Sequence, residues 1–232
     1  ERKDQRRGTT RTGDPWRITA VVAAPQAKKA NSEVLEALLG GADAIELRTA
    51  QSTMQPVLND VLLAAIDLQL HKGNEQQLRE VLHMAQHQHV APNVLSLCAD
   101  FPLDTDPTAL RERISAYPLL RLFQISDLRK PGDGPIECMK QALAQGQALL
   151  ERLTRSGWPI DDAAARIQFR LHLGDDLFLE AARIRAFRAA WAQVVQGFSP
   201  AHACSVNTFI QCEVQYDPEP KSPYDQALRA TL

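Results

Sequence analysis

Residues 167–195 read IQFRLHLGDDLFLEAARIRAFRAAWAQVV and carry the strongest helix signal in the chain. Residues 167–173 alternate with period two, which predicts a β-strand. Residues 175–195 follow with helical spacing, and Asp175 and Asp176 favour the positive N-terminus of a helix. The predicted apolar stripe of this helix consists of Leu177, Phe178, Ala181, Ile184, Phe187, Trp191 and Val194 or Val195. The stretch therefore predicts a strand, a short turn and a long amphipathic helix.

The same alternation of strand and helix extends along the rest of the chain. Further strands are predicted at residues 17–23, 44–48, 68–70, 93–98, 119–125 and 205–211. Further helices are predicted at residues 28–39, 59–66, 75–87, 106–115, 135–155 and 223–232. Strands that alternate with helices at a period of about 30 residues predict parallel βαβ units. We therefore expect an α/β fold, a (β/α)8 parallel barrel of TIM type in residues 15–232, after an N-terminal arm in residues 1–14.

A barrel of this type needs eight strands, and the sequence offers seven strand signals. Residues 135–155 are helical but contain Gly146, so we expect the remaining strand to lie near that glycine. The alternative fold is a doubly wound sheet. It is disfavoured because Ala23, Ala24 and Pro25 follow the first strand, where a Gly-rich phosphate-binding turn would stand.

Charge and cysteine content restrict the class of protein. The chain of 232 residues carries 26 Lys plus Arg and 28 Asp plus Glu, so its net charge is −2. This balance argues against partners such as nucleic acid or a membrane surface. No apolar run approaches the roughly 18 residues of a membrane span. The four cysteines are scattered and form no C-x-x-C pair, which fits reduced thiols in the cytoplasm.

Two candidate site residues lie near or after the carboxyl ends of predicted strands. His172 lies near the carboxyl end of the strand 167–173, where barrel enzymes build their active sites, so it is a candidate general acid or substrate hydrogen-bond donor. The alternative is a structural histidine held by the adjacent carboxylates. Arg129 lies in the loop 127–134, where it could hold a phosphate or carboxylate group. The alternative there is a solvated turn.

Two other patterns have simpler interpretations. His83 and His87 have an i, i+4 spacing that can hold a metal ion, but they lie in a Gln-rich stretch that we interpret as a solvated helix face. Asp161 and Asp162 precede a helical segment, so we interpret them as a helix N-cap rather than an acid/base pair. We therefore predict no metal site.

Three stretches together resemble the methylmalonyl-CoA mutase family: residues 7–17 (RGTTRTGDPWR), residues 167–195 and residues 222–229 (SPYDQALR). The middle stretch matches the family pattern Phe-x-x-x-Ala-x-x-Arg-Ala-x-Arg-x-x-Trp-Ala. The matching residues are Phe178, Ala182, Arg185, Ala186, Arg188, Trp191 and Ala192. The resemblance is nearest to the small subunit, a degenerate copy of the catalytic one. It implies that Phe178, Arg185, Trp191 and Arg229 form the core.

The resemblance implies adenosylcobalamin-dependent isomerisation of an acyl-CoA, methylmalonyl-CoA to succinyl-CoA. Catalytic barrels of the family thread the CoA chain down their axis and meet cobalamin at one mouth. Their fifth strand is followed by Gly-Tyr-His, where this chain has Ser126, Asp127 and Leu128. Their last strand carries His-x-Gln-Thr-Ser-Gly, of which this chain keeps Gln211. Gln211 is therefore a candidate substrate-binding residue, and we assign no catalytic residue.

The family's cobalamin module carries Asp-x-His-x-x-Gly, and this sequence contains no Asp-x-His. Either the chain is a fragment cut before that module or it never had one, and its stop at Leu232 within a just-started helix favours a fragment. In both cases we expect this chain alone not to bind adenosylcobalamin tightly. Three functions stay open. The first is a mutase-like barrel that binds an acyl-CoA. The second, which we favour, is a non-catalytic barrel that stabilises a mutase catalytic subunit or a second copy of itself. The third is a stand-alone (β/α)8 enzyme that uses His172 and the Arg129 loop on a small anion.

Overall fold

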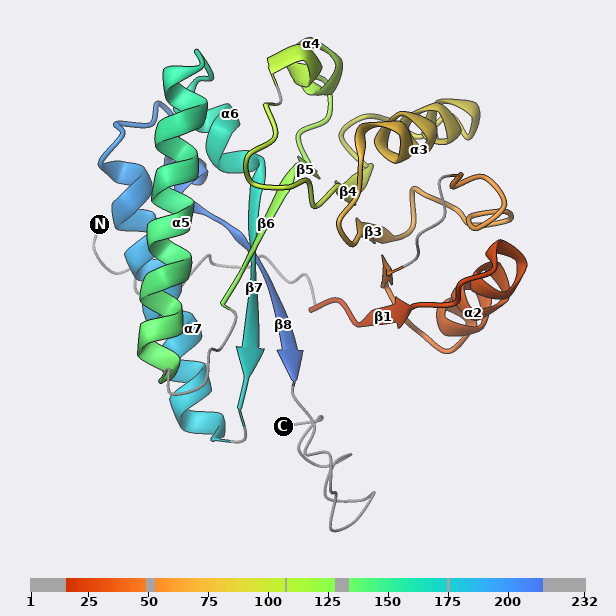
Figure 1. Ribbon diagram of the computed structural model, residues 1–232, viewed down its shortest axis with the longest axis horizontal. Helices are drawn as coiled ribbons and strands as arrows, with labels where there is room; N and C mark the ends of the chain where they lie inside the picture. The colour runs from red at the N-terminus through yellow and green to blue at the C-terminus, as the bar shows by residue number, and fades with distance from the viewer. Residues whose placement is uncertain (1–15, 49–52, 107, 128–133, 175, 215–232) are drawn as a thin grey trace. The chain divides into compact units, whose positions relative to one another are not determined.

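The computed structural model describes residues 16–48, 53–106, 108–127, 134–174 and 176–214 (Figure 1). The described chain divides into two compact units, with the boundary between Gln124 and Ile125. We refer to them as the N-terminal unit and the C-terminal unit. The predicted N-terminal arm, Arg129 and the predicted last helix at 223–232 lie outside the described residues.

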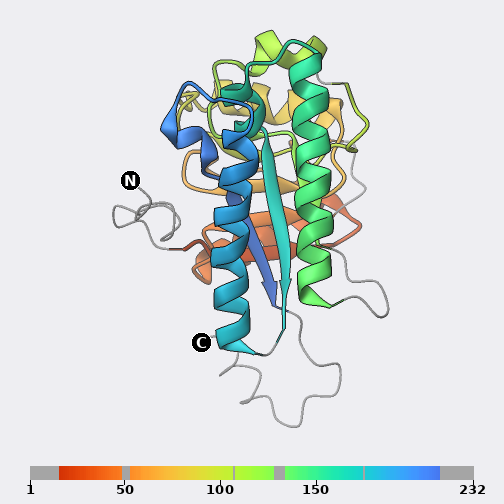
Figure 2. The same ribbon diagram turned by 90° about the vertical axis from the view of Figure 1, so that its left-hand side faces the viewer.

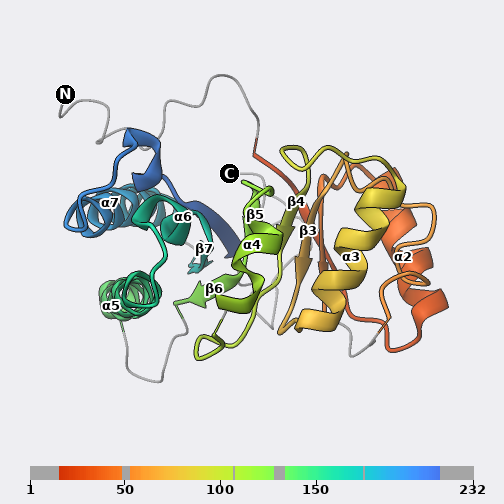
Figure 3. The same ribbon diagram turned by 90° about the horizontal axis from the view of Figure 1, so that it is seen from above.

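The N-terminal unit is built on a five-stranded sheet. Its strands are β1 (Thr19–Val22), β2 (Ala44–Leu47), β3 (Asp67–Leu70), β4 (Ser96–Cys98) and β5 (Leu120–Arg121), paired in that order and all parallel. The helices α2 (Ala27–Leu39) and α3 (Glu75–His87) lie along this sheet (Figure 3). The predicted parallel βαβ arrangement is therefore confirmed for this part of the chain.

The two faces of the five-stranded sheet differ in chemistry. Side chains alternate between faces along a strand. One face carries buried aliphatic residues, among them Ile45, Leu47, Leu68, Leu70 and Leu97. The opposite face carries buried polar residues: Glu46, Asp67, Gln69, Ser96 and Arg121. Burial on both faces is typical of parallel sheets, but polar residues on one of them are unusual and need partners.

The predicted helix at residues 59–66 is wrong. The segment forms successive turns, with Asp60 in the left-handed region at φ 60°. Its apolar residues, including Val61 and Leu63, are nevertheless buried. Gln88, at the end of α3, donates to the Val61 carbonyl at 2.8 Å and accepts from the Leu63 N–H at 3.0 Å. Side chains of neighbouring elements thus replace helical hydrogen bonds, so the apolar spacing reports burial and not helix.

The predicted strand at 119–125 and the predicted helix at 106–115 are both divided. The strand becomes β5 and β6 (Phe123–Ser126), separated by Leu122. The helix becomes a 3-10 turn, η1 (Thr108–Leu110), followed by α4 (Arg111–Ile114). Asp106 accepts from the Thr108 N–H at 3.0 Å, as expected for a capping residue.

A second sheet has the order β6, β7 (Ile167–Leu173) and β8 (Phe209–Val214), and all of it except Phe123 and Gln124 of β6 belongs to the C-terminal unit. Strands β7 and β8 are parallel, with Arg170 opposite Gln211 and His172 opposite Glu213. The helices α5 (Pro135–Arg155), α6 (Ile160–Ala165) and α7 (Leu177–Gln196) complete the unit. Helices α5 and α7 run side by side along the sheet (Figures 1 and 2).

The strand predicted near Gly146 does not exist. Helix α5 continues through Gly146, which is buried. A Cβ atom at this position would lie 2.6 Å from Trp191 Cζ3 and 2.9 Å from Phe169 Cζ. The glycine therefore allows α5 to approach two aromatic rings closely and does not interrupt the helix.

The predicted apolar stripe of α7 is correct only in its carboxyl-terminal part. Phe187, Trp191 and Val195 are fully buried, and Asp176 caps the helix by accepting from the Leu179 N–H at 3.0 Å. At the beginning of the helix, by contrast, Phe178 is 86% exposed.

The core role that the family resemblance implied for Phe178 and Arg185 is also wrong, because both residues are exposed. Helix α7 instead buries the charged residues Glu180 and Arg183. Trp191 is confirmed as a core residue, and Arg229 lies outside the described residues.

Asp161 has a different role from the predicted N-cap. Pro159 is the N-cap residue of α6, and no side chain caps this helix. The Asp161 carboxylate instead accepts from the backbone N–H groups of Ala201 and His202, both at 3.1 Å, and from the Ser205 hydroxyl. These hydrogen bonds, above all that from Ser205, hold the pKa of Asp161 below its usual value. They also fix the 3-10 turn η2 (Ala203–Val206), so the last strand begins at Phe209 and not at residue 205.

Candidate functional site

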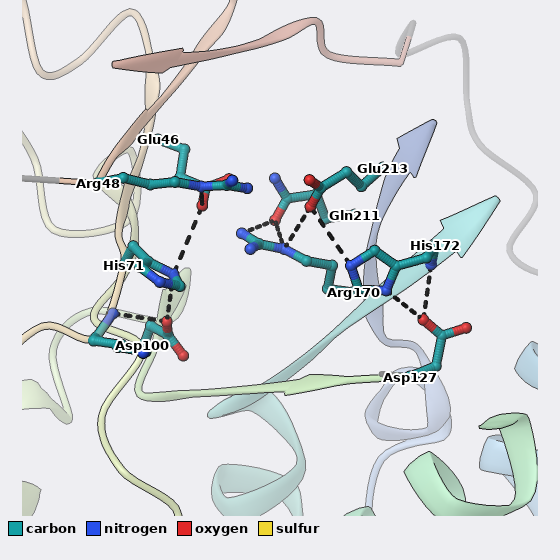
Figure 4. A network of polar contacts seen from close by, with 10 residues as sticks. Glu46, Arg48, His71, Asp100, Asp127, Arg170, His172, Gln211 and Glu213 are labelled. Carbon is teal, nitrogen blue, oxygen red and sulfur yellow. Dashed lines mark hydrogen bonds and ion pairs between the residues drawn. The ribbon is translucent and has the colours of Figure 1, made fainter. Parts of the chain in front are cut away.

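The candidate site lies where β6, β7 and β8 end, at an edge where parallel sheets place functional side chains. We call it the β7–β8 polar cluster. Its members are Asp127, Arg170, His172, Glu180, Arg183, Gln211 and Glu213. All of them belong to the C-terminal unit. Figure 4 shows Arg170 and His172 on β7, Gln211 and Glu213 on β8, and Asp127 directly after β6.

Asp127 orients His172. The Asp127 carboxylate is buried, and its Oδ1 accepts from the His172 backbone N–H at 2.7 Å and lies 2.8 Å from His172 Nδ1. A carboxylate can only accept, so Nδ1 carries the proton of this hydrogen bond. The Nε2 atom of His172 is consequently the ring nitrogen that can exchange a proton with a ligand.

Arg183 holds this pair in place from α7. Its Nη1 donates to Asp127 Oδ2 at 2.6 Å, and its Nε donates to Glu180 Oε2 at 2.6 Å. Glu180 also accepts from the Gly174 N–H at 2.9 Å, which ties the β7–α7 turn to the helix. Burial alone would lower the pKa of Arg183, but its hydrogen bonds to Asp127 and Glu180 raise it above the ordinary value. The guanidinium therefore stays charged and fixes the orientation of Asp127.

The second half of the cluster joins β7 to β8. Arg170 is buried, and its Nη2 and Nε donate to Gln211 Oε1 at 3.0 and 3.3 Å. The Arg170 Nε atom lies 3.7 Å from Glu213 Oε2, and the same oxygen lies 3.8 Å from His172 Nε2. One nitrogen atom of an arginine and one of a histidine thus lie within 3.8 Å of the same carboxylate oxygen. Such an arrangement can bind an anionic group or transfer a proton to it.

The N-terminal unit has polar side chains at the ends of its own strands. His71 Nδ1 lies 3.6 Å from Asp100 Oδ2 and 3.9 Å from Glu46 Oε1, and Arg48 Nε donates to Glu46 at 2.7 Å (Figure 4). Deeper on the same face, Arg121 forms a buried ion pair with Asp67.

That ion pair belongs to a buried cluster that fills the polar face of the sheet. Ser96 donates to Asp67 at 2.9 Å, and Arg121 donates to Ser96 at 3.3 Å. The cluster therefore provides hydrogen-bonding partners for buried polar groups on this face.

The three residues predicted to bind substrate have different outcomes. His172 and Gln211 both join the β7–β8 polar cluster, on neighbouring strands, whereas Arg129 lies outside the described residues. Sequence reasoning missed Arg170, Arg183 and Glu213. A usable signal existed, because Arg170 and Glu213 interrupt apolar strands at positions that share a face with His172 and Gln211.

His83 and His87 lie on the exposed surface of α3, with their Nε2 atoms 3.2 Å apart. Within the described ranges, no group of three or more His, Cys, Asp or Glu side chains could hold a metal ion. Among the same residues, none of the helices has both the length and the apolar character needed to cross a bilayer.

Cys98 lies on the polar face of the N-terminal unit, and we expect it to be chemically inert. Burial raises the pKa of its thiol to about 12, with a smaller opposing effect from Arg121. At pH 8 only about one thiol in ten thousand would be ionised, and the thiolate is the reactive form. We expect Ellman's reagent to label the exposed Cys204 quickly and Cys98 only after unfolding. Labelling of Cys98 in the native protein at a rate similar to that of Cys204 would contradict the assignment.

Comparison with known proteins shows which family this chain resembles. The family model "Methylmalonyl-CoA mutase" matches residues 124–231, just under half of the chain. The "Probable methylmalonyl-CoA mutase small subunit" of Mycobacterium bovis is 28% identical over 96% of this chain and 41% of its own length. The "Methylmalonyl-CoA mutase small subunit" of Propionibacterium freudenreichii subsp. shermanii is 28% identical over 83% of this chain and 34% of its own length.

These matches confirm the resemblance to the methylmalonyl-CoA mutase family, and they show that the chain spans less than half of these relatives. A solved dipeptide epimerase from Methylococcus capsulatus is 14% identical over 84% of this chain and 55% of that chain, with a TM-score of 0.38. A score this low gives no support for a shared fold.

Proposed function

We propose that this chain is the barrel part of a methylmalonyl-CoA mutase small subunit, and that it supports a catalytic partner instead of catalysing the rearrangement itself. The named relatives support the subunit assignment. The partner we propose is the catalytic subunit of the same mutase, since a small subunit implies a larger one.

The buried cluster of Asp67, Ser96 and Arg121 is the observation that carries the non-catalytic role. A catalytic barrel of this family threads the CoA chain along its axis, so the inward face of its sheet must leave room. Here the polar face of the five-stranded sheet is filled by Arg121, whose side chain is fully buried. Separating the members of a buried ion pair costs much stability, so we do not expect a ligand to displace this cluster.

The β7–β8 polar cluster supports the same conclusion. Asp127 stands where catalytic members carry the Tyr-His that follows the fifth strand. Its carboxylate is committed to His172 and Arg183 and is no substitute for a donor to a thioester carbonyl. The site therefore stabilises the protein, and it lacks the donor that the family's chemistry would need at this position.

We further propose that both sheets belong to one (β/α)8 barrel. The two sheets contain eight strands, and only Leu122 separates the end of β5 from the start of β6. Closure would leave β1 and β8 without a free edge. Hydrogen exchange tests this directly, because closure predicts slow exchange for the amides of β1 and β8. Exchange of both strands at the rate of exposed loops would contradict closure.

Adenosylcobalamin does not fit the residues described. The family's cobalt-ligating Asp-x-His is missing from the sequence. His172 is directed by Asp127 toward Glu213, within the polar cluster. We therefore propose that this chain alone does not bind the cofactor, and that the catalytic partner carries it.

A titration with methylmalonyl-CoA tests the proposed function. The full-length protein, free of any second subunit, is titrated in a calorimeter. We expect no saturable binding in the micromolar range, because Arg121 and its partners fill the sheet face. Saturable micromolar binding would contradict the proposal.

The Asp127–His172 pair favours one alternative, a stand-alone (β/α)8 enzyme that acts on a small anion. An oriented histidine beside a buried arginine suits proton transfer to such a substrate. Two results together would favour this alternative. The protein would not bind the catalytic subunit, and it would turn over a small carboxylate in a reaction that His172→Gln abolishes.

A further inference from the structure

We propose that His83 and His87 on α3 form a surface site that chelates one divalent transition-metal ion. The ligand class is an ion for which imidazole nitrogen is a suitable donor, such as Ni²⁺, Cu²⁺ or Zn²⁺. The sequence predicts no metal site, but its spacing leaves open the separation of the two rings, which the structure supplies. This inference goes beyond the proposed subunit role and does not depend on it.

Helix α3 holds the two histidines on one rigid frame. The helix packs through a buried face that includes Leu78, Val81 and Leu82. His83 and His87 lie on its exposed face, and residues four positions apart are neighbours along a helix. The backbone positions of the two side chains are therefore fixed before an ion arrives.

The separation of the two rings suits a shared ion. The Nε2 atoms of His83 and His87 lie 3.2 Å apart. Nitrogen ligands lie about 2.0–2.1 Å from Zn²⁺, so two of them at this separation subtend an angle of about 100° at the ion. This angle lies between the values of about 90° and about 109° in octahedral and tetrahedral coordination. The ring planes are inclined by 76°, so the rings do not stack face to face.

The contact between the rings uses one hydrogen whose place the ion would take. Two Nε2 atoms form a hydrogen bond only if one carries hydrogen and the other accepts. A neutral imidazole can hold its single ring proton on either nitrogen, so transfer of this proton to Nδ1 leaves both Nε2 lone pairs for the ion. Both side chains are exposed, so Nδ1 can then donate to solvent.

The surroundings of the pair accept a positive charge. His87 is the last residue of α3, and the carboxyl end of a helix carries a partial negative charge that favours cations. Arg79, one turn before His83, donates through Nε to Glu75 Oε1 at 2.9 Å, one turn farther from the pair. Within the part of the chain that the structure describes, no third His, Cys, Asp or Glu completes a metal-binding group. The two imidazoles are thus the proposed ligands, and water would complete the coordination.

The test titrates the full-length protein, carrying no polyhistidine tag, with NiCl2 at pH 8, where imidazole side chains are ordinarily neutral. Calorimetry gives the affinity, and paramagnetic Ni²⁺ broadens the NMR signals of nearby rings. We expect saturable binding of one Ni²⁺ ion per chain, with selective broadening of the His83 and His87 ring signals.

Two variants each remove one ligand. We expect His83→Gln and His87→Gln each to weaken Ni²⁺ binding by roughly tenfold or more, because the second ligand of a linked pair acts at a high effective concentration. Both positions are exposed, so both variants should fold. Absence of saturable binding to the wild type would overturn the proposal, and so would binding that is unchanged in both variants.

His89→Asn is the matched control. His89 is exposed and has a φ of 54°, a conformation that asparagine tolerates. This variant loses one exposed imidazole and keeps the pair, so it should bind Ni²⁺ as the wild type does. Equal weakening in all three variants would overturn the proposal, since it would reflect surface imidazoles in general. Excess Mg²⁺, which prefers oxygen ligands, should not displace Ni²⁺, and displacement would also overturn it.

Discussion

Replacing Trp191 by alanine is expected to lower the free energy of unfolding by about 3–5 kcal/mol, the usual cost of removing a large buried aromatic side chain. Trp191 is fully buried on α7, and its ring centroid lies 4.7 Å from that of Phe169 in an edge-to-face arrangement. Gly146 of α5 contacts the same ring closely, so truncation leaves a cavity between two helices and β7. Urea denaturation measures the change.

Trp16→Ala is the control for this prediction. Trp16 is 70% exposed, so the same truncation should change stability by no more than about 0.5 kcal/mol, as is usual at the surface. Equal effects for the two tryptophans would mean that the α7 stripe does not face a core.

Asp127→Ala should cost about 3–5 kcal/mol, because it leaves a buried arginine without one of its two carboxylate partners. The side chains of Asp127 and Arg183 are 1% and 4% exposed, and Asp127 also accepts two hydrogen bonds from His172. Urea denaturation of the variant and the wild type at the same pH gives the difference.

Asp176→Ala is the corresponding control. This aspartate is exposed and accepts one backbone hydrogen bond, from Leu179, as the N-cap of α7. Its removal should cost about 1 kcal/mol, the typical value of a cap. If Asp127→Ala costs no more than Asp176→Ala, the buried network does not stabilise the fold as described.

Periodicity predicted much of the fold, because it reports which side chains are buried. The strand 167–173 and the helix 75–87 have the bounds observed in β7 and α3. It failed where burial has another cause. Residues 59–66 are apolar because turns bury them, and Gly146 lies in α5 because two aromatic rings need the space of a side chain.

The candidate site could be predicted only in part. His172 and Gln211 were accessible to sequence reasoning, since each lies in a strand with a recognisable pattern. Arg183 was not, because a helical pattern read for apolar residues assigns a charged residue to solvent. Its burial depends on Asp127, which is 56 residues away in the sequence. No local sequence pattern reports a contact between residues so far apart in the chain.

If this chain is a supporting barrel, as we propose, it should not act as a mutase by itself. The most direct test incubates the full-length protein with adenosylcobalamin and methylmalonyl-CoA, without a second subunit, and assays succinyl-CoA. We expect no turnover above the uncatalysed background, and turnover when the catalytic subunit is added. Turnover by the protein alone at about 1 per second or faster, a rate typical of enzymes, would contradict it.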